Sequence, residues 1–170
     1  MLVERSIHPE WLSNAYLVAD EEGGAAVFVD SGADVKPLLE AAERWRVEPS
    51  FVLRTHSHHD HVVHEGELGL PVRTDAVEVG GLHVEALPTP GHSDDMVAFV
   101  VNGEAVFTGD TLFKDSVGGV EQRLDVRARV DEDGRAALLV GDEVGVREPV
   151  RVHRPLDYHR AKTTQRPRRS

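Results

Sequence analysis

The sequence predicts an α/β fold, because strand-like and helix-like segments alternate along most of the chain. Short apolar runs between residues 14 and 107 have strand character, and each ends in a turn or in a polar cluster. Residues 35–45 instead carry apolar side chains at helical spacing. With 170 residues and 40% hydrophobic content, the chain is long enough for one domain with a buried core.

Two strands are expected in residues 14–18 and 26–32, followed by the helix of residues 35–45. Asp34 is suited to cap that helix, and a proline in the first turn also favours its start. One face of the helix should pack on the sheet, which places Trp45 in the core.

Further strands are expected over residues 49–54 and 82–87, with a short helix over residues 62–70 between them. Residues 96–107 have the pattern of a hairpin around the turn Asn102-Gly103.

Residues 55–61 concentrate metal-binding side chains, with four imidazoles and one carboxylate in seven positions. The donors are His56, His58, His59, Asp60 and His61. A histidine-rich run can also be a solvated loop or a purification tag. The strand pattern directly before this run favours a metal site, because α/β proteins build their sites at strand ends.

His92 and Asp110 also follow predicted strands, and a glycine beside each allows the backbone to turn toward an ion. A single histidine or aspartate after a strand is more often a cap or turn residue. Three polar strand ends in one chain favour a common site instead.

Three motifs resemble those of the metallo-β-lactamase superfamily, and in style they are similar to its glyoxalase II-like hydrolases. They are His56-Ser57-His58-His59-Asp60-His61, Thr89-Pro90-Gly91-His92 and Thr108-Gly109-Asp110-Thr111-Leu112-Phe113. The resemblance implies a four-layer αββα sandwich whose C-terminal half is incomplete or divergent.

The resemblance also implies two metal ions, expected to be Zn²⁺, with Fe or Mn as alternatives. The implied ligands are His56, His58 and His92 for the first ion, and Asp60, His61 and the bridging Asp110 for the second. A metal-bound hydroxide would then attack a thioester or ester carbonyl, with Asp60 and Asp110 in catalytic roles. The chain has no cysteine, so the thiolate ligand of the antibiotic-degrading members is absent and β-lactamase activity is not expected.

Two other functions stay open on the sequence alone. A mono-iron persulfide dioxygenase of the same superfamily uses two histidines and one aspartate, so it needs no further histidine. The other possible function is that of a catalytically impaired remnant that only binds metal. The divergent C-terminal part of the chain favours this alternative.

The resemblance covers residues 1–119, which we predict to form a metallo-β-lactamase-like domain. Residues 120–160 are expected to be a divergent part of the same domain, and residues 161–170 a disordered basic tail. The family's final Gly-His motif, which supplies the last ligand of the second metal, has no clear counterpart, because His153 and His159 lack the expected neighbours.

Codons for residues 154–160 can be chosen so that a reading one nucleotide later encodes Gly-His-Ser-Thr-Thr-Thr, as in the family's motif. This match leads to the hypothesis that the last third of the chain is a shifted reading frame. A second departure is that the segment between His61 and His92 is short, which leaves little room for the family's helix, strand and hairpin.

The composition excludes some partners. A net charge of −11 argues against nonspecific attraction to nucleic acids or membranes, and the apolar runs are too short to span a bilayer. The first residues lack a secretion signal pattern, and the absence of cysteine suits a reducing cytoplasm. We therefore expect a cytoplasmic enzyme that acts on a small-molecule thioester or ester, with no prediction of its oligomeric state.

Overall fold

The computed structural model of the chain describes six stretches of residues. They are 1–113, 116–117, 125–130, 136–142, 145–146 and 150–152. Side-chain surroundings are described for residues 1–112.

The first sheet has five strands in the order β1-β2-β3-β4-β5. Their bounds are β1 Leu2–Ile7, β2 Asn14–Ala19, β3 Ala25–Ser31, β4 Glu48–Leu53 and β5 Val72–Arg73. The first three strands pair antiparallel, whereas β3, β4 and β5 run parallel. The sequence predicted β2, β3 and β4 but not β1, whose central residues are polar or charged and gave no apolar run.

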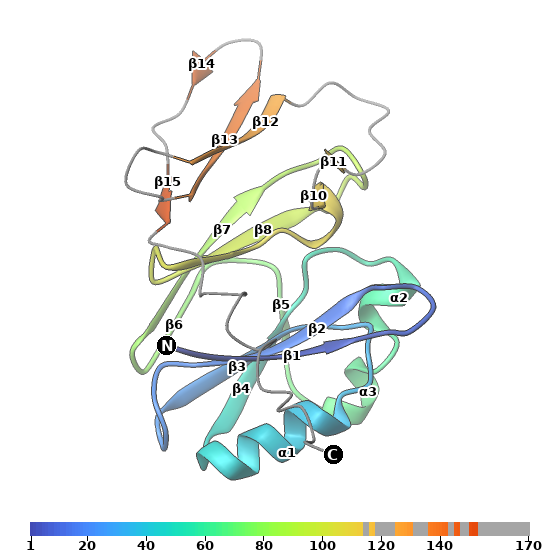
Figure 1. The fold of residues 1–170 in the computed structure, drawn as a ribbon, viewed down its shortest axis with the longest axis vertical. Coiled ribbons are helices and arrows are strands. Elements are labelled where there is room, and N and C mark those ends of the chain that lie inside the picture. The colour runs from blue at the N-terminus through green and yellow to red at the C-terminus, as the bar shows by residue number, and fades with distance from the viewer. Residues whose placement is uncertain (114–115, 118–124, 131–135, 143–144, 147–149, 153–170) are drawn as a thin grey trace, which may run out of the picture.

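Helix α1 (Lys36–Trp45) covers one face of this sheet (Figure 1). Its buried side chains pack against Leu17 and Phe28 of the sheet, and Trp45 is partly buried against the same core. The predicted cap is off by one residue, because Val35 is the N-cap and has no side-chain cap hydrogen bond. Asp34 lies just before it and accepts a hydrogen bond from the backbone N–H of Lys36 at 3.0 Å. The helix ends at Arg46, which has left-handed backbone geometry (φ 58°).

The helix expected over residues 62–70 is wrong in its bounds. The structure has two short helices instead, α2 (His59–Val62) and α3 (Glu65–Leu68). The break has a physical cause, because the backbone N–H of His64 donates to the carbonyl of Ser31 at 3.1 Å rather than within a continuous helix. His61 therefore lies inside α2 and not before a helix.

The second sheet is an antiparallel meander in the order β6-β7-β8-β9. Its strands are β6 Val77–Val79, β7 Leu82–Pro88, β8 Val97–Val101 and β9 Ala105–Phe107. The predicted hairpin turn is confirmed, since Asn102 and Gly103 both have positive φ, at 53° and 62°. The segment between His61 and His92 is short, but its elements are short as well. Helix α3, strand β5 and the β6–β7 hairpin all fit there.

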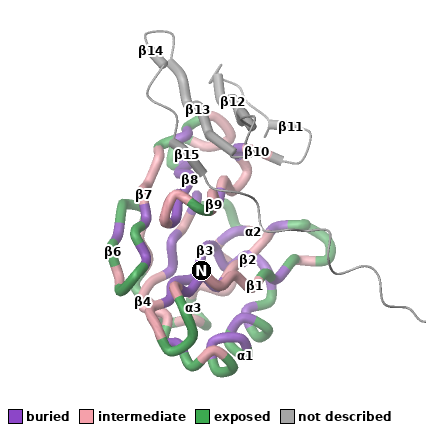
Figure 2. Tube along the Cα trace, turned by 60° about the vertical axis from the view of Figure 1, so that its left-hand side comes forward, coloured by how far each residue is buried: buried purple, intermediate pink, exposed green. Residues whose placement is uncertain are grey.

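The two sheets face each other across a second apolar core. Val27 and Val29 of the first sheet pack there with Val84, Phe99 and Phe107 of the second. Figure 2 shows the buried residues lying along the strands of both sheets and along one side of α1. The described residues thus form a helix, a sheet and a second sheet in layers, which confirms the predicted α/β sandwich class.

The remaining described strands lie after the second sheet. They are β10 Leu112–Phe113, β11 Ser116–Val117, β12 Asp125–Val130, β13 Ala136–Asp142, β14 Gly145–Val146 and β15 Val150–Val152. Strands β12 to β15 form a sheet of their own. The predicted tail of residues 161–170, His153 and His159 lie outside the described residues.

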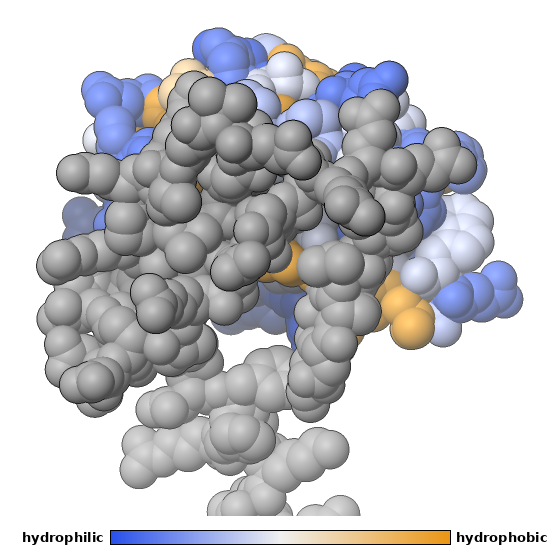
Figure 3. Space-filling model, turned by 90° about the horizontal axis from the view of Figure 1, so that it is seen from above, coloured by the Kyte–Doolittle hydropathy of each residue, from blue (hydrophilic) through white to orange (hydrophobic). Residues whose placement is uncertain are grey.

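On the face shown in Figure 3, hydrophilic and hydrophobic areas are both visible around the grey atoms. A search of the described helices for one long and apolar enough to cross a membrane found none.

Candidate metal centre

The site lies where parallel strands β3 and β4 end side by side. Val29 of β3 is paired with Leu53 of β4, so Asp30 and Thr55 emerge at the same edge of the sheet. Asp30 accepts hydrogen bonds from the Thr55 backbone N–H at 2.7 Å and from the Thr55 hydroxyl at 2.8 Å. These bonds fix the start of the loop that carries His56 and His58.

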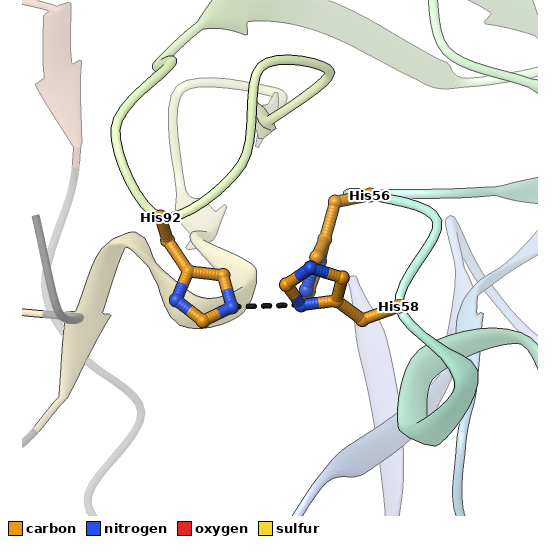
Figure 4. Close-up of side chains that lie close together, drawn as sticks. All are labelled: His56, His58 and His92. Atoms are coloured by element: carbon orange, nitrogen blue, oxygen red, sulfur yellow. Dashed lines mark hydrogen bonds between the residues drawn. The ribbon is translucent and has the colours of Figure 1, made fainter. Parts of the chain in front are cut away.

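The first cluster consists of His56, His58 and His92, and one ring nitrogen of each lies within 4.8 Å of the others. His56 and His58 come from the loop after β4, whereas His92 comes from the loop after β7. The rings of His58 and His92 point toward each other in Figure 4, and His58 Nδ1 lies 2.9 Å from His92 Nε2. His56 is buried, while His58 is exposed at the mouth of the cluster.

The second cluster consists of His56, His61 and Asp110, whose donor atoms also lie within 4.8 Å of one another. Asp110 lies between the clusters, with Oδ1 3.2 Å from His61 Nε2 and Oδ2 3.5 Å from His92 Nε2. Asp60 is at the rim, where its Oδ2 is 3.9 Å from His61 Nε2.

All six residues that the sequence singled out as ligands therefore lie together. The grouping differs from the implied ligand sets in two respects. His56 belongs to both tight clusters, and Asp60 belongs to neither. Two neighbouring imidazoles lie outside both clusters: the His59 ring contacts Trp11, and His64 Nδ1 lies 2.7 Å from Glu67.

Asp30 supports the second cluster and was not recognised from the sequence as a site residue. Its buried carboxylate is 2.8 Å from His61 Nδ1. A carboxylate on one ring nitrogen fixes the tautomer and the orientation of a histidine whose other nitrogen binds metal. The available signal was the Asp-x-Gly turn of residues 30–32, whose aspartate has positive φ (53°).

Two glycines let these loops approach closely. A Cβ atom on Gly32 would overlap the backbone oxygen of Asp60, so only glycine allows α2 to pack on the turn after β3. A Cβ atom on Gly109, which has φ 48°, would overlap the side chain of Thr55. This contact brings Asp110 beside the loop of His56.

Burial and neighbouring charges set the protonation of the centre. Burial and the positive charge of His61 lower the pKa of His56 to about 4, so His56 is neutral at pH 7. Burial also opposes the charge on His61, but the nearby carboxylates of Asp110 and Asp30 together outweigh it and raise its pKa to about 10. Burial raises the pKa of Asp110, but the surrounding histidines, with His61 foremost, together outweigh burial and hold this pKa below its usual value.

One structural observation indicates that these residues are suited to bind a metal ion. His56 Nε2 and His61 Nε2 are both buried and lack a hydrogen-bond partner. The other nitrogen of each ring is occupied, by Thr55 for His56 and by Asp30 for His61. Buried polar atoms without partners are rare, and this arrangement of one anchored and one open ring nitrogen is typical of metal-ligating histidines.

A cavity of about 570 Å³ opens beside the second cluster. Asp60, His61 and Asp110 line one part of it, and residues of β1, the loop after β1, β2 and β9 contribute to other parts. Its size is within the range of small-molecule sites.

No protein-family model matches the chain. The cytoplasmic hydroxyacylglutathione hydrolase of Arabidopsis thaliana is 35% identical over 126 residues, which cover 58% of this chain and 48% of that protein. A probable polyketide biosynthesis zinc-dependent hydrolase, BaeB of Bacillus velezensis, is 25% identical, with 67% and 61% covered. The chain spans about half the length of the hydroxyacylglutathione hydrolases that it matches.

Solved structures agree with these relatives. ETHE1 from Myxococcus xanthus is 29% identical with a TM-score of 0.60, over 69% of this chain and 61% of that one. TTHA1623 in a di-iron-bound form is 28% identical with a TM-score of 0.54, over 68% and 77%. The BLEG-1 B3 metallo-β-lactamase has a TM-score of 0.60 over 72% and 78%, and at 22% identity it supports the fold alone.

Proposed function

Because this chain belongs to the metallo-β-lactamase superfamily, we propose that it is a metal-dependent hydrolase that acts on thioesters or other carboxylic esters. The observation that carries this proposal is the pair of histidine clusters that share His56, with two buried ring nitrogens left open. The hydroxyacylglutathione hydrolases among its relatives support a thioester as the substrate.

The proposed ligands form two sets, one for each ion. His56, His58 and His92 would hold one ion, and His61 with Asp110 and Asp60 a second. When bound, a divalent ion polarises a carbonyl oxygen and lowers the pKa of water. Zn²⁺ is the metal proposed, because tetrahedral sites of histidine and carboxylate suit it and one relative is named a zinc-dependent hydrolase.

Asp60 and Asp110 have separate proposed roles. The carboxylate of Asp110 lies between the clusters, where its negative charge would offset the repulsion between two cations. Asp60 is about one third exposed and lines the cavity, so its carboxylate can orient an attacking water and accept its proton.

Metal loading and hydrolysis test this proposal together. The purified chain should be stripped with a chelator, reloaded separately with Zn²⁺, Fe²⁺ or Mn²⁺, and assayed for thiol release from a hydroxyacylglutathione and from acetyl thioesters. We expect release only after reloading. A chain that binds no ion, or that releases no thiol with any of them, would contradict the proposal.

Iron is the competing metal, because one similar structure is in a di-iron-bound form. The persulfide dioxygenase alternative predicts iron in the purified protein and oxygen uptake with glutathione persulfide. Elemental analysis and an oxygen electrode separate it from the hydrolase.

A further inference from the structure

The last residue of β1 and the loop between β1 and β2 present large apolar side chains beside the cavity. Ile7, Trp11 and Leu12 are 44%, 46% and 69% exposed, and all three line the cavity that reaches His61 and Asp110. Scattered exposed apolar residues need no explanation, but neighbouring ones along one cavity are typical of a binding surface.

Hydrogen bonds of the backbone and of the His8 ring hold this loop in shape. The backbone N–H of His8 donates to Ser13 at 2.9 Å, and that of Leu12 donates to the His8 carbonyl at 3.0 Å. His8 Nδ1 accepts the backbone N–H groups of Glu10 and Trp11, and its ring stacks on Trp11 at 4.2 Å. The apolar side chains are therefore presented by a loop that is already ordered.

Leu12 occupies left-handed backbone geometry, with φ at 61°. Glycine or asparagine would adopt this conformation more readily than leucine. Strained backbone of this kind is concentrated at sites that bind ligands. The loop thus accepts strain at the position of its most exposed apolar side chain.

Aromatic side chains connect this loop with the rim of the metal centre and with other parts of the cavity. The rings of Trp11 and His59 make a T-shaped contact at a centroid distance of 5.5 Å, and His59 lies between His58 and Asp60 in the sequence. The cavity also includes Phe107, although Arg5 and Asn14 contribute polar atoms to it. An apolar group bound here would lie next to the second cluster.

From these observations we propose that the cavity binds an apolar, alkyl or aryl part of the substrate, and that Trp11 and Leu12 determine this specificity. The proposal rests on the proposed ester or thioester hydrolysis. It adds that the enzyme prefers substrates with a bulky apolar group over the small polar hydroxyacyl group.

Two series of thioesters test the preference. In one, acyl chains from acetyl to hexanoyl are attached to N-acetylcysteamine; in the other, alkyl thiols of rising length carry one acetyl group. We expect kcat/KM to rise about fourfold per methylene in one series, the effect of burying a CH₂ group. The series that rises identifies which side of the ester enters the cavity.

Variants of the loop test whether it causes this rise of kcat/KM per methylene, the slope of the series. Trp11→Ala and Leu12→Asn should reduce it to below about twofold per methylene while acetyl thioesters are still hydrolysed; Asn also tolerates the left-handed backbone. Trp11→Phe should restore most of the slope. Leu39→Ala is the matched control, because Leu39 is 42% exposed on α1 and is not among the residues that line the cavity. Two flat series, or a slope that both loop variants retain, would overturn the proposal.

A binding measurement keeps this test separate from hydrolysis. The chain has two tryptophans, so Trp45→Phe leaves Trp11 as the only one. Its fluorescence should shift to shorter wavelength, in a saturable way, with the S-hexyl thioether of N-acetylcysteamine but not with the S-methyl one. Loss of hydrolysis with this shift retained would refute the proposed function alone, and absence of the shift in a folded variant would refute the apolar site.

Discussion

His58 is the most exposed ligand of the first cluster, so its removal should disturb the fold least. His58→Ala leaves only His56 and His92 there, and a position that water alone can fill. We expect the affinity for the first ion to fall at least about 100-fold, measured by calorimetry on the chelator-stripped protein, and hydrolysis to be lost. His64→Ala is the control, because that imidazole lies outside both clusters. Full metal content with parental turnover in His58→Ala would refute the assignment.

Asp110 connects the two clusters, since its oxygens lie 3.2 Å from His61 Nε2 and 3.5 Å from His92 Nε2. Asp110→Asn keeps the shape but removes the charge that offsets two cations. Both metal affinities should fall together in a calorimetric titration. If the variant binds two ions as tightly as the parent, Asp110 is a structural turn residue.

Asp30 touches no proposed ion, yet it holds the ring of His61 and the backbone of Thr55. Asp30→Asn should lower the affinity of the second site about 10- to 100-fold, as expected when a supporting partner of a ligand is lost. The first ion should lose less affinity, because Asp30 contacts His61 directly but reaches His56 only through Thr55. Equal loss at both sites would indicate general unfolding, and circular dichroism would identify it.

At the scale of elements, Gly32 sets how closely the turn after β3 approaches α2. Gly32→Ala would force its Cβ into the backbone of Asp60, so we expect a loss of about 1–3 kcal/mol in the free energy of unfolding and weaker metal binding by His61. Gly66→Ala in α3 meets nothing within 4 Å and should be neutral or stabilising, because alanine is the better helix former. Denaturant titration of both variants decides, and equal stabilities would contradict the packing argument.

The elements also show where sequence reasoning is reliable. Apolar alternation and the Asn102-Gly103 turn predicted the β8–β9 hairpin, because these signals are local. The helix over residues 62–70 was misplaced, because its break depends on a bond from His64 to Ser31, which is distant in sequence. The role of Asp30 was missed for the same reason, since it appears only when β3 and β4 pair.

At the scale of the whole molecule, the motifs located the candidate site because each follows a strand whose end reaches the same edge. Two features were not predictable, because both depend on how loops from four strands converge. One is that His56 belongs to both clusters, and the other is that apolar side chains of the β1–β2 loop line the cavity. The division into residues 1–119, 120–160 and 161–170 remains a prediction.

The C-terminal third of the chain should decide whether the second metal site is complete. The first cluster takes all its ligands from the described loops. Among the described residues, the second cluster has no further histidine of the kind that the family's Gly-His motif supplies. We therefore expect this chain to bind one ion tightly and a second weakly. The reading frame one nucleotide later, from about codon 120, should encode an amphipathic helix and then Gly-His-Ser-Thr-Thr-Thr, and protein made from that frame should bind two ions tightly. Nucleotide sequencing and metal stoichiometry test both parts. A shifted frame without the motif would refute the frame hypothesis, and two equally tight ions in the present chain would show that its second site is already complete.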